Sequence, residues 1–367
     1  MSYQQQILEW YHHFHAHPEI SGREIETTHA IARILDGLSV RYKRFPDCTG
    51  LIAEIGEGAH TVALRADIDA LWQEVGGVMR ANHSCGHDAH MAMALGAIRY
   101  LMDRKLDRVY RFIFQPAEEK GNGSLWMIER GAMKGVSALF GMHVRPEDEL
   151  PYGQFAPSLH HGACIFLEGK ITGIDAHGAR PHQGRNAIDA VVAIHAYLKS
   201  LYMAPDDSYS VKLTKIMAGG ENANIIPGTA TFSIDVRAQE NRVMDALMDS
   251  IGTGMDSIAK LYGVAIDYEW QDYTPGATVS QEAEAAAREA IIEIAGEDAL
   301  SPAIITPGSD DFHFYSRKHP EVQATMIGIG ASVKPGLHHP DMAIQTDILD
   351  QGARVLARAM QLVDLKE

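Results

Sequence analysis

The chain has 367 residues, which is more than one ordinary hydrophobic core organises, so we expect two domains. Apolar residues make up 46% of it and charged residues 22%, a composition typical of globular proteins and not of disordered ones. The formal charge of −16 argues against nucleic acid or an anionic membrane as the main partner.

The sequence also shows no sign of a membrane anchor or an export signal. No apolar run approaches the roughly 20 residues that span a bilayer, and the polar start of the chain lacks the regions of a signal peptide. The cysteines Cys48, Cys85 and Cys164 are odd in number, so we expect no disulfide framework but a possible metal-binding or catalytic thiol. The expected location is the cytoplasm.

Helix-like and strand-like stretches alternate over the N-terminal part of the chain. In chain order they are a helix over Ile25–Leu38, strands over Leu51–Ile55 and Thr61–Ala66, a helix over 88–103, a strand over Val109–Phe114, a helix over 122–131 and a strand over Ala138–Met142. Such alternation predicts an α/β layer with a mostly parallel sheet.

The middle of the chain follows a different order. Its elements are a strand over Ala163–Ile174, a helix over Asn186–Leu201, strands over Val211–Met217 and Thr229–Val236, a helix over Val243–Leu261 and a strand over Val264–Trp270. This is the split βαβ pattern of a ferredoxin-like α+β domain.

After Pro275 the first style resumes, with a helix over 281–295, a strand over Ala324–Ile329 and a helix over 347–363. We therefore predict a discontinuous larger domain over residues 1–168 and 279–367, and a smaller inserted domain over residues 169–278.

The densest cluster of chemically active residues is HSCGHDAH, from His83 to His90. Cys85 and His87 are two residues apart, so in an extended loop both side chains point the same way and can share a metal ion. A thiolate and an imidazole suit zinc or a similar borderline ion. The structural alternative is a polar turn before a helix that begins at Asp88.

A pair of glutamates, Glu118 and Glu119, follows closely on an apolar strand. Adjacent residues on irregular backbone point apart, so one carboxylate can bind a metal ion while the other faces a bound water. Metal-assisted hydrolysis needs that division, because the ion lowers the pKa of the water and the free carboxylate takes its proton. The alternative is a solvated acidic pair in a surface loop.

Three sets of polar groups fall just past the ends of predicted strands. They are Asp67 with Asp69, the glutamate pair, and His143. Because open α/β sheets bind ligands at the carboxyl ends of their strands, we expect these groups to meet at one edge. Carboxylate, imidazole and thiolate together suit a pair of cocatalytic ions. Taken alone, His143 is more often a structural histidine.

The inserted segment has candidates of its own. His177 lies in a polar loop before a helix, Asn224 precedes a strand, and Arg237 ends that strand. Arg237 could hold a substrate carboxylate through a bidentate pair, and Asn224 could donate to the same group. A purely local role in a loop or at a helix start is the alternative for each.

Together these motifs resemble the M20 metallopeptidase family, above all its amidohydrolase branch, which includes hippurate hydrolases, bacterial aminoacylases and auxin-conjugate hydrolases. The matching stretches are LRADIDAL at 64–71, HSCGHDAHMAM at 83–93, FIFQPAEEKGNG at 112–123, GMHV at 141–144, AHGARPHQG at 176–184, AGGENANIIPGTA at 218–230, GSDDFHFY at 308–315 and LHHP at 337–340. The resemblance runs nearly end to end, and ordered motifs of this length are far more specific than any one of them.

The resemblance implies a zinc-exopeptidase-like catalytic domain and an inserted lid domain through which two subunits form a homodimer. It also implies two divalent ions of zinc, manganese, cobalt or nickel. The implied ligands are Cys85, His87, Glu119, His143 and His338.

The resemblance further assigns roles to residues around the ions. Glu118 corresponds to the general base and Asp69 to the carboxylate that orients the site. His177 corresponds to a lid histidine that reaches the partner subunit's active site and helps stabilise the oxyanion. Asn224 and Arg237 match residues that recognise the substrate's carboxylate.

The implied reaction is hydrolysis of the amide bond of small N-acyl-L-amino acids. The alternatives are a dipeptidase of the same family, a non-catalytic metal-binding protein on a hydrolase scaffold, and a cysteine nucleophile at Cys85, which would need an activating base.

A few positions depart from the family pattern. Trp72 follows Ala70 and Leu71 where relatives usually have Leu-Pro, so it can reshape the pocket wall, and the segment after it is short. Asp310 replaces the usual glutamate of Gly-Ser-Glu-Asp-Phe, which puts any role carried over for it in doubt. Either His338 or His339 could be the ligand, and the spacing to the following proline favours His338.

Overall fold

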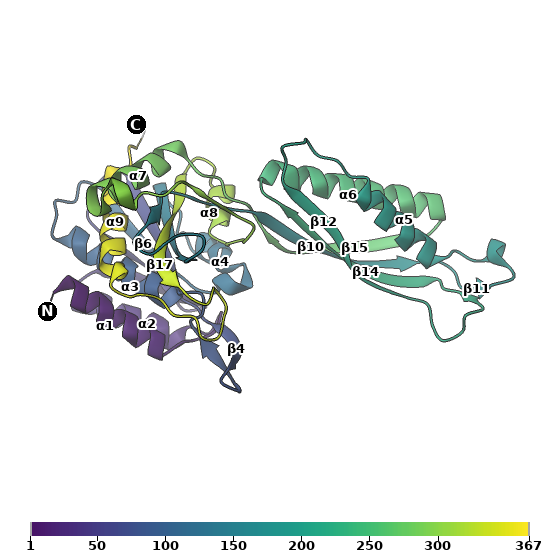
Figure 1. Cartoon of the computed structure of the whole chain (residues 1–367), viewed down its shortest axis with the longest axis horizontal. Helices are drawn as coiled ribbons and strands as arrows, with labels where there is room; N and C mark the ends of the chain where they lie inside the picture. Colours follow the sequence, from purple (N-terminus) through teal and green to yellow (C-terminus); the bar gives the residue numbers. More distant parts are fainter. Residues whose placement is uncertain (1, 366–367) are drawn as a thin grey trace. The chain divides into compact units, whose positions relative to one another are not determined.

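The computed structural model describes residues 2–365, which form two compact units (Figure 1). Unit 1 contains the residues up to His160, Thr278–Thr306 and those from Asp310 on, and unit 2 contains His161–Ala277 and Pro307–Ser309. The expected boundary after residue 168 lies inside strand β10 (Ala163–Thr172). The whole strand belongs to unit 2, because both of its neighbours in the sheet are strands of that unit.

The centre of unit 1 is a seven-stranded mixed sheet. In spatial order its strands are β1 (Arg41–Phe45), β2 (Cys48–Ile55), β6 (Val109–Gln115), β3 (Thr61–Asp67), β7 (Val136–Pro146), β17 (Gln323–Val333) and β8 (Phe155–Ala156). The four strands β6, β3, β7 and β17 run parallel, which confirms the predicted parallel core. The outer strands pair antiparallel.

Helices cover both faces of this sheet, so unit 1 has three layers (Figure 1). One core is shared by α1 (Tyr3–Ala16), α2 (Ile25–Gly37), α3 (His87–Met102), α7 (Gln281–Ala295) and α9 (Ile348–Leu362), and the other by α4 (Gly123–Glu129) and α8 (His313–Lys318). Side chains alternate along β3, so Val62 and Leu64 face the first core and Ala63 faces the second.

Smaller elements complete unit 1. Strands β4 (Leu71–Val75) and β5 (Val78–Asn82) form a hairpin, and β9 (Leu159–His161) pairs with β16 (Ile304–Thr306). The hairpin turns at two glycines with φ of 60° and 82°, a region that glycine enters without strain. Short 3-10 turns lie at η1 (Glu118–Lys120) and η3 (Glu297–Ala299).

Unit 2 is a four-stranded antiparallel sheet in the order β12-β14-β10-β15, with two helices on one face (Figure 1). After β10 its chain order is α5 (Ala187–Lys199), β12 (Tyr209–Ala218), β14 (Thr229–Ala238), α6 (Asn241–Tyr262) and β15 (Ala265–Thr274). This is the predicted ferredoxin-like order, which is confirmed. A ribbon of β11 (Ala176–His177) and β13 (Ile225–Ile226) and the turn η2 (Pro181–Gln183) are added to it.

Two expectations from composition can be compared directly with this fold. Within residues 2–365, no helix combines the length and apolar character that crossing a membrane requires. The thiols of Cys48, Cys85 and Cys164 form no disulfide among the described residues.

Candidate metal centre

Parallel strands deliver acidic and imidazole groups to one edge of the unit 1 sheet. β3 ends at Asp67, β6 ends at Gln115 just before the glutamate pair, and β7 carries His143. These strands are parallel neighbours, so their carboxyl ends meet at the same edge. The predicted position of His143, just past the end of a strand, was wrong. His143 lies inside β7, because pairing with β17 extends that strand to Pro146.

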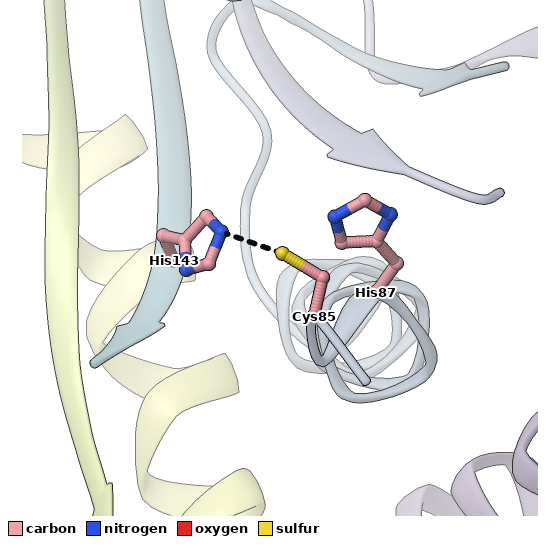
Figure 2. A group of neighbouring side chains, drawn as sticks. All are labelled: Cys85, His87 and His143. Carbon is pink, nitrogen blue, oxygen red and sulfur yellow. Dashed lines mark hydrogen bonds between the residues drawn. The ribbon is translucent and has the colours of Figure 1, made fainter. Parts of the chain in front are cut away.

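A tight turn places Cys85 and His87 at the start of α3. Gly86 between them has φ of 85°, and a Cβ there would lie 2.4 Å from Cγ2 of Val144, so only glycine fits. Figure 2 shows the two side chains beside His143, whose Nε2 lies 3.6 Å from Sγ of Cys85. The ligand atoms of these three buried residues all lie within 4.8 Å of one another.

A second group of ligand atoms shares Cys85. Its Sγ, a carboxylate oxygen of Glu119 and a ring nitrogen of His338 also lie within 4.8 Å of one another. Nε2 of His338 is 3.4 Å from Oε1 of Glu119. Glu119 comes from η1, and His338 comes from the loop between β17 and α9. Cys85 therefore belongs to both groups of candidate ligands.

Two buried polar atoms in this cluster, Nε2 of His87 and Oε1 of Glu119, have no hydrogen-bond partner among the described residues and lie 3.9 Å apart. Buried polar atoms are normally paired, and leaving one unpaired costs free energy. Nδ1 of His87 is held by the backbone oxygen of Asp69 at 2.9 Å, and Nδ1 of His143 by the oxygen of Val144 at 2.6 Å. Nε2 of His87 therefore has no hydrogen-bond partner, and Nε2 of His143 meets only the thiol of Cys85, so this donor set fits divalent metal ions.

Asp69 orders the ligands around it. Its Oδ2 accepts from the hydroxyl of Ser21 at 2.6 Å and from the backbone N–H of Glu119 at 3.1 Å, and its Oδ1 lies 3.2 Å from Nδ1 of His87. Burial raises the pKa of Asp69, but the hydrogen bonds from His87 and Ser21 outweigh it and hold that pKa below its usual value. An ionised carboxylate in this position orients a ligating imidazole.

His90 lies beside the cluster without a free nitrogen. Its Nδ1 is 2.7 Å from Oδ1 of Asp67, and its Nε2 accepts from the backbone N–H of Val144 at 3.0 Å. Both ring nitrogens of His90 are therefore used in hydrogen bonds within the protein, although His90 belongs to the same HSCGHDAH stretch as His87.

Glu118 stands next to the ligand groups. Its Oε2 lies 3.9 Å from Nε2 of His87. Burial raises the pKa of its carboxyl well above the usual value in the metal-free protein, and the nearby charges of Asp310, Glu119 and Asp311 raise it further. A carboxyl group with a raised pKa close to the candidate ligands is suited to acid–base chemistry there.

Comparison with known proteins identifies this arrangement. Residues 63–362 match peptidase family M20/M25/M40. The chain belongs to this family. The matched range includes all five candidate ligands and both units, so the resemblance seen in the sequence is confirmed.

Relatives and a solved structure of the M20 family cover nearly the whole chain. An N-acetylcysteine deacetylase of Bacillus subtilis (strain 168) is 31% identical over 379 residues, which cover 95% of this chain and 94% of the relative. An IAA-amino acid hydrolase of Arabidopsis thaliana, ILR1-like 2, is 30% identical and covers 96% of this chain and 84% of its own. A Bacillus subtilis dinuclear metal binding peptidase of the M20 family superposes with a TM-score of 0.83 at 29% identity, covering 99% of both chains. The chain is therefore a metal-dependent hydrolase of amide bonds.

Behind this M20 site lies a buried ionic network that the sequence analysis missed. Arg65 is fully buried and donates to Gln115 at 2.9 Å, to Asp311 at 2.8 Å, to Asp310 at 3.2 Å and to Asp67. A charged residue inside an otherwise apolar strand is the signal that could have found it, because such a charge needs a buried partner.

Asp311 ties together both ends of the segment that carries the glutamate pair. Its carboxylate accepts from the side-chain amide of Gln115 at 2.8 and 3.0 Å and from the backbone N–H of Ser124 at 2.9 Å. Asp310, whose role was in doubt, reaches Arg65 despite being one methylene shorter than the usual glutamate. The network thus fixes Gln115 and Ser124, the residues on either side of the loop that carries Glu118.

The remaining predicted site residues belong to unit 2. The ribbon of β11 and β13 brings His177 and Asn224 close, because the N–H of Gly178 donates to the carbonyl of Asn224 at 2.7 Å. Both side chains are exposed. Arg237 lies near the far end of β14, where its Nε donates to Asp235 at 3.0 Å. Unit 2 thus brings His177 and Asn224 together and keeps Arg237 apart from them.

Proposed function

We propose that this protein hydrolyses the amide bond of N-acyl-L-amino acids with two divalent ions held by Cys85, His87, Glu119, His143 and His338. The observation that carries this proposal is the pair of buried atoms without a hydrogen bond, Nε2 of His87 and Oε1 of Glu119, beside a shared sulfur and an adjacent second glutamate. The names of the deacetylase and of the amino acid conjugate hydrolase among the relatives support this substrate class. The dinuclear centre named for the solved relative supports two ions.

The protein's own side chains divide the chemical work. Divalent ions bound here would act as Lewis acids and lower the pKa of water. Glu118 takes the proton of the attacking water and returns it to the leaving amine nitrogen. Asp69 keeps His87 in the tautomer that leaves Nε2 free.

Residues of unit 2 complete the proposed substrate site. Arg237 binds the substrate's carboxylate, and His177 stabilises the oxyanion in the partner subunit's site. Because unit 2 places Asn224 beside His177 and apart from Arg237, Asn224 can contact the same carboxylate only when it enters that site together with His177 from the partner subunit. Only Nε of Arg237 donates to Asp235, so a carboxylate can bind the terminal nitrogens of the guanidinium without displacing that contact.

We assign a homodimer to unit 2, since its outer surface has exposed apolar side chains. β12 is an edge strand of its sheet and exposes Ile216 and Met217, while α5 exposes Ile188 and Val192. Val192→Glu should convert the protein to a monomer in sedimentation analysis. A wild-type monomer, or a dimer that survives this change, would refute the assignment.

Glu118→Gln tests the catalytic assignment, because glutamine keeps the shape but cannot take a proton. We expect hydrolysis of N-acetyl amino acids by the metal-loaded variant to fall at least about 10²-fold. Metal content measured alongside should match the wild type. Glu129→Gln is the control, since this side chain is 75% exposed. Retention of most activity by the Glu118 variant would defeat the assignment.

Three rivals are separable by simple measurements. A dipeptidase would cleave a dipeptide faster than its N-acetylated analogue. A non-catalytic scaffold would turn over no member of an N-acyl amino acid panel with zinc, manganese, cobalt or nickel. A nucleophilic Cys85 would resist chelators, but burial raises the pKa of its thiol well above the usual value, and the charge of Glu119 raises it further, which disfavours a free thiolate.

A further inference from the structure

One side chain connects the β4–β5 hairpin to the loop that carries His338. Nε2 of Gln73 donates to the backbone carbonyl of His338 at 3.0 Å. Its Oε1 accepts from the hydroxyl of Ser84 at 2.6 Å and from the amide of Asn82 at 2.9 Å. A carbonyl oxygen can only accept, so the amide nitrogen of Gln73 must face His338.

The other backbone group of His338 is held by the same network. Its N–H donates to the carbonyl of Ser84 at 2.7 Å, and Ser84 is the residue before Cys85. Asn82 also donates to the carbonyl of Pro340 at 3.0 Å. The network therefore connects the segment of Cys85 to the segment of His338 through both the N–H and the carbonyl of His338.

His338 needs such support because of its backbone and its surroundings. Its φ is 64°, a left-handed conformation that residues with side chains rarely adopt. Its side chain is 54% exposed and lies in a loop between β17 and α9. Packing does not fix this ring, so the hydrogen bonds to its backbone are what direct it toward Glu119.

We propose that Gln73 is a positioning residue that fixes His338 relative to Cys85 and thereby sets the affinity of the ion position formed by Cys85, Glu119 and His338. This inference rests on the proposed metal centre. The other position shares Cys85 but takes its remaining ligands from His87 and His143, whose side chains Gln73 does not contact and which are held by α3 and β7. Loss of Gln73 should therefore weaken one ion and spare the other.

Calorimetric titration of the metal-free, full-length protein with manganese(II) tests this selectivity. Gln73→Met keeps the length of the side chain but removes both polar atoms. We expect the affinity of one ion to fall about 10–100-fold, the range typical of lost outer partners of a metal ligand, and that of the other to stay within about twofold. Glu74→Gln is the control, since Glu74 is exposed and points to the opposite face of β4.

The outcomes separate this inference from the function on which it rests. Two ions bound as tightly as in the wild type would overturn the role of Gln73 and leave the metal centre intact. Equal weakening of both ions, with a lower unfolding midpoint of the metal-free variant, would mean a general structural role and would also overturn it. A wild-type protein that binds no ions would overturn the metal centre itself.

Discussion

Replacing Arg65 by methionine should destabilise unit 1 by about 3–5 kcal/mol. The guanidinium is fully buried and donates to Asp67, Asp310 and Asp311 as well as to Gln115. Methionine keeps most of the side chain's length, but it leaves three carboxylates buried without their cation. Removing one partner from a buried charge network costs about this much, because the remaining charges lose both solvent and counter-ion.

Urea unfolding of the metal-free protein, followed by tryptophan fluorescence, measures this loss. Arg358→Met is the matched control, because Arg358 pairs with Glu293 where the side chains are 34% and 39% exposed. Surface pairs of this kind contribute about 0–1 kcal/mol. If the Arg65 variant lost no more stability than the Arg358 variant, the buried network would not support the fold as we describe.

Two further changes test the electrostatics and the packing of unit 1. Burial and the neighbouring Asp310 raise the pKa of Asp311 from 3.8 to about 7, so the native protein holds a proton there that the unfolded chain releases. The free energy of unfolding of the metal-free wild type should therefore fall relative to that of Asp311→Asn as the pH rises from about 4 to 7. A difference between the two free energies that stays constant over this pH range would contradict that pKa. A Cβ on Gly96 in α3 would lie 2.8 Å from the Cβ of Ala353. The crowding in Gly96→Ala should lower the unfolding free energy by about 1–3 kcal/mol, and the better helix propensity of alanine should restore about 1 kcal/mol of it. Gly37→Ala, with no atom within 4 Å, should lower it not at all, and equal effects in thermal melts would refute the crowding.

Local patterns predicted the main elements of unit 2, because its helices α5 and α6 each bury one face. The helix α1 was missed although a signal for it exists, since Ser2 and Gln5 form a capping box at its start. The β4–β5 hairpin was missed too, although Gly76 and Gly77 mark its turn.

The buried network could not be predicted in the same way. An arginine inside an apolar strand indicates a buried partner, but nothing local selects Asp310 and Asp311, 245 and 246 residues away, from 48 acidic residues. The distinction between His90 and His143 is also tertiary. Both are buried histidines, and only their hydrogen bonds distinguish them. Asp67 and the backbone of Val144 occupy both ring nitrogens of His90, whereas Nε2 of His143 contacts only the thiol of Cys85, which is itself a candidate ligand.

A cobalt(II) titration of the metal-free protein, read by its near-ultraviolet thiolate-to-metal absorption, tests the metal centre most directly. We predict that two ions bind per chain and that the absorption disappears in Cys85→Ser but persists in Cys164→Ser, whose thiol lies in unit 2. A wild-type chain that binds no cobalt, or an absorption band that survives the loss of Cys85, would contradict a centre built around that sulfur.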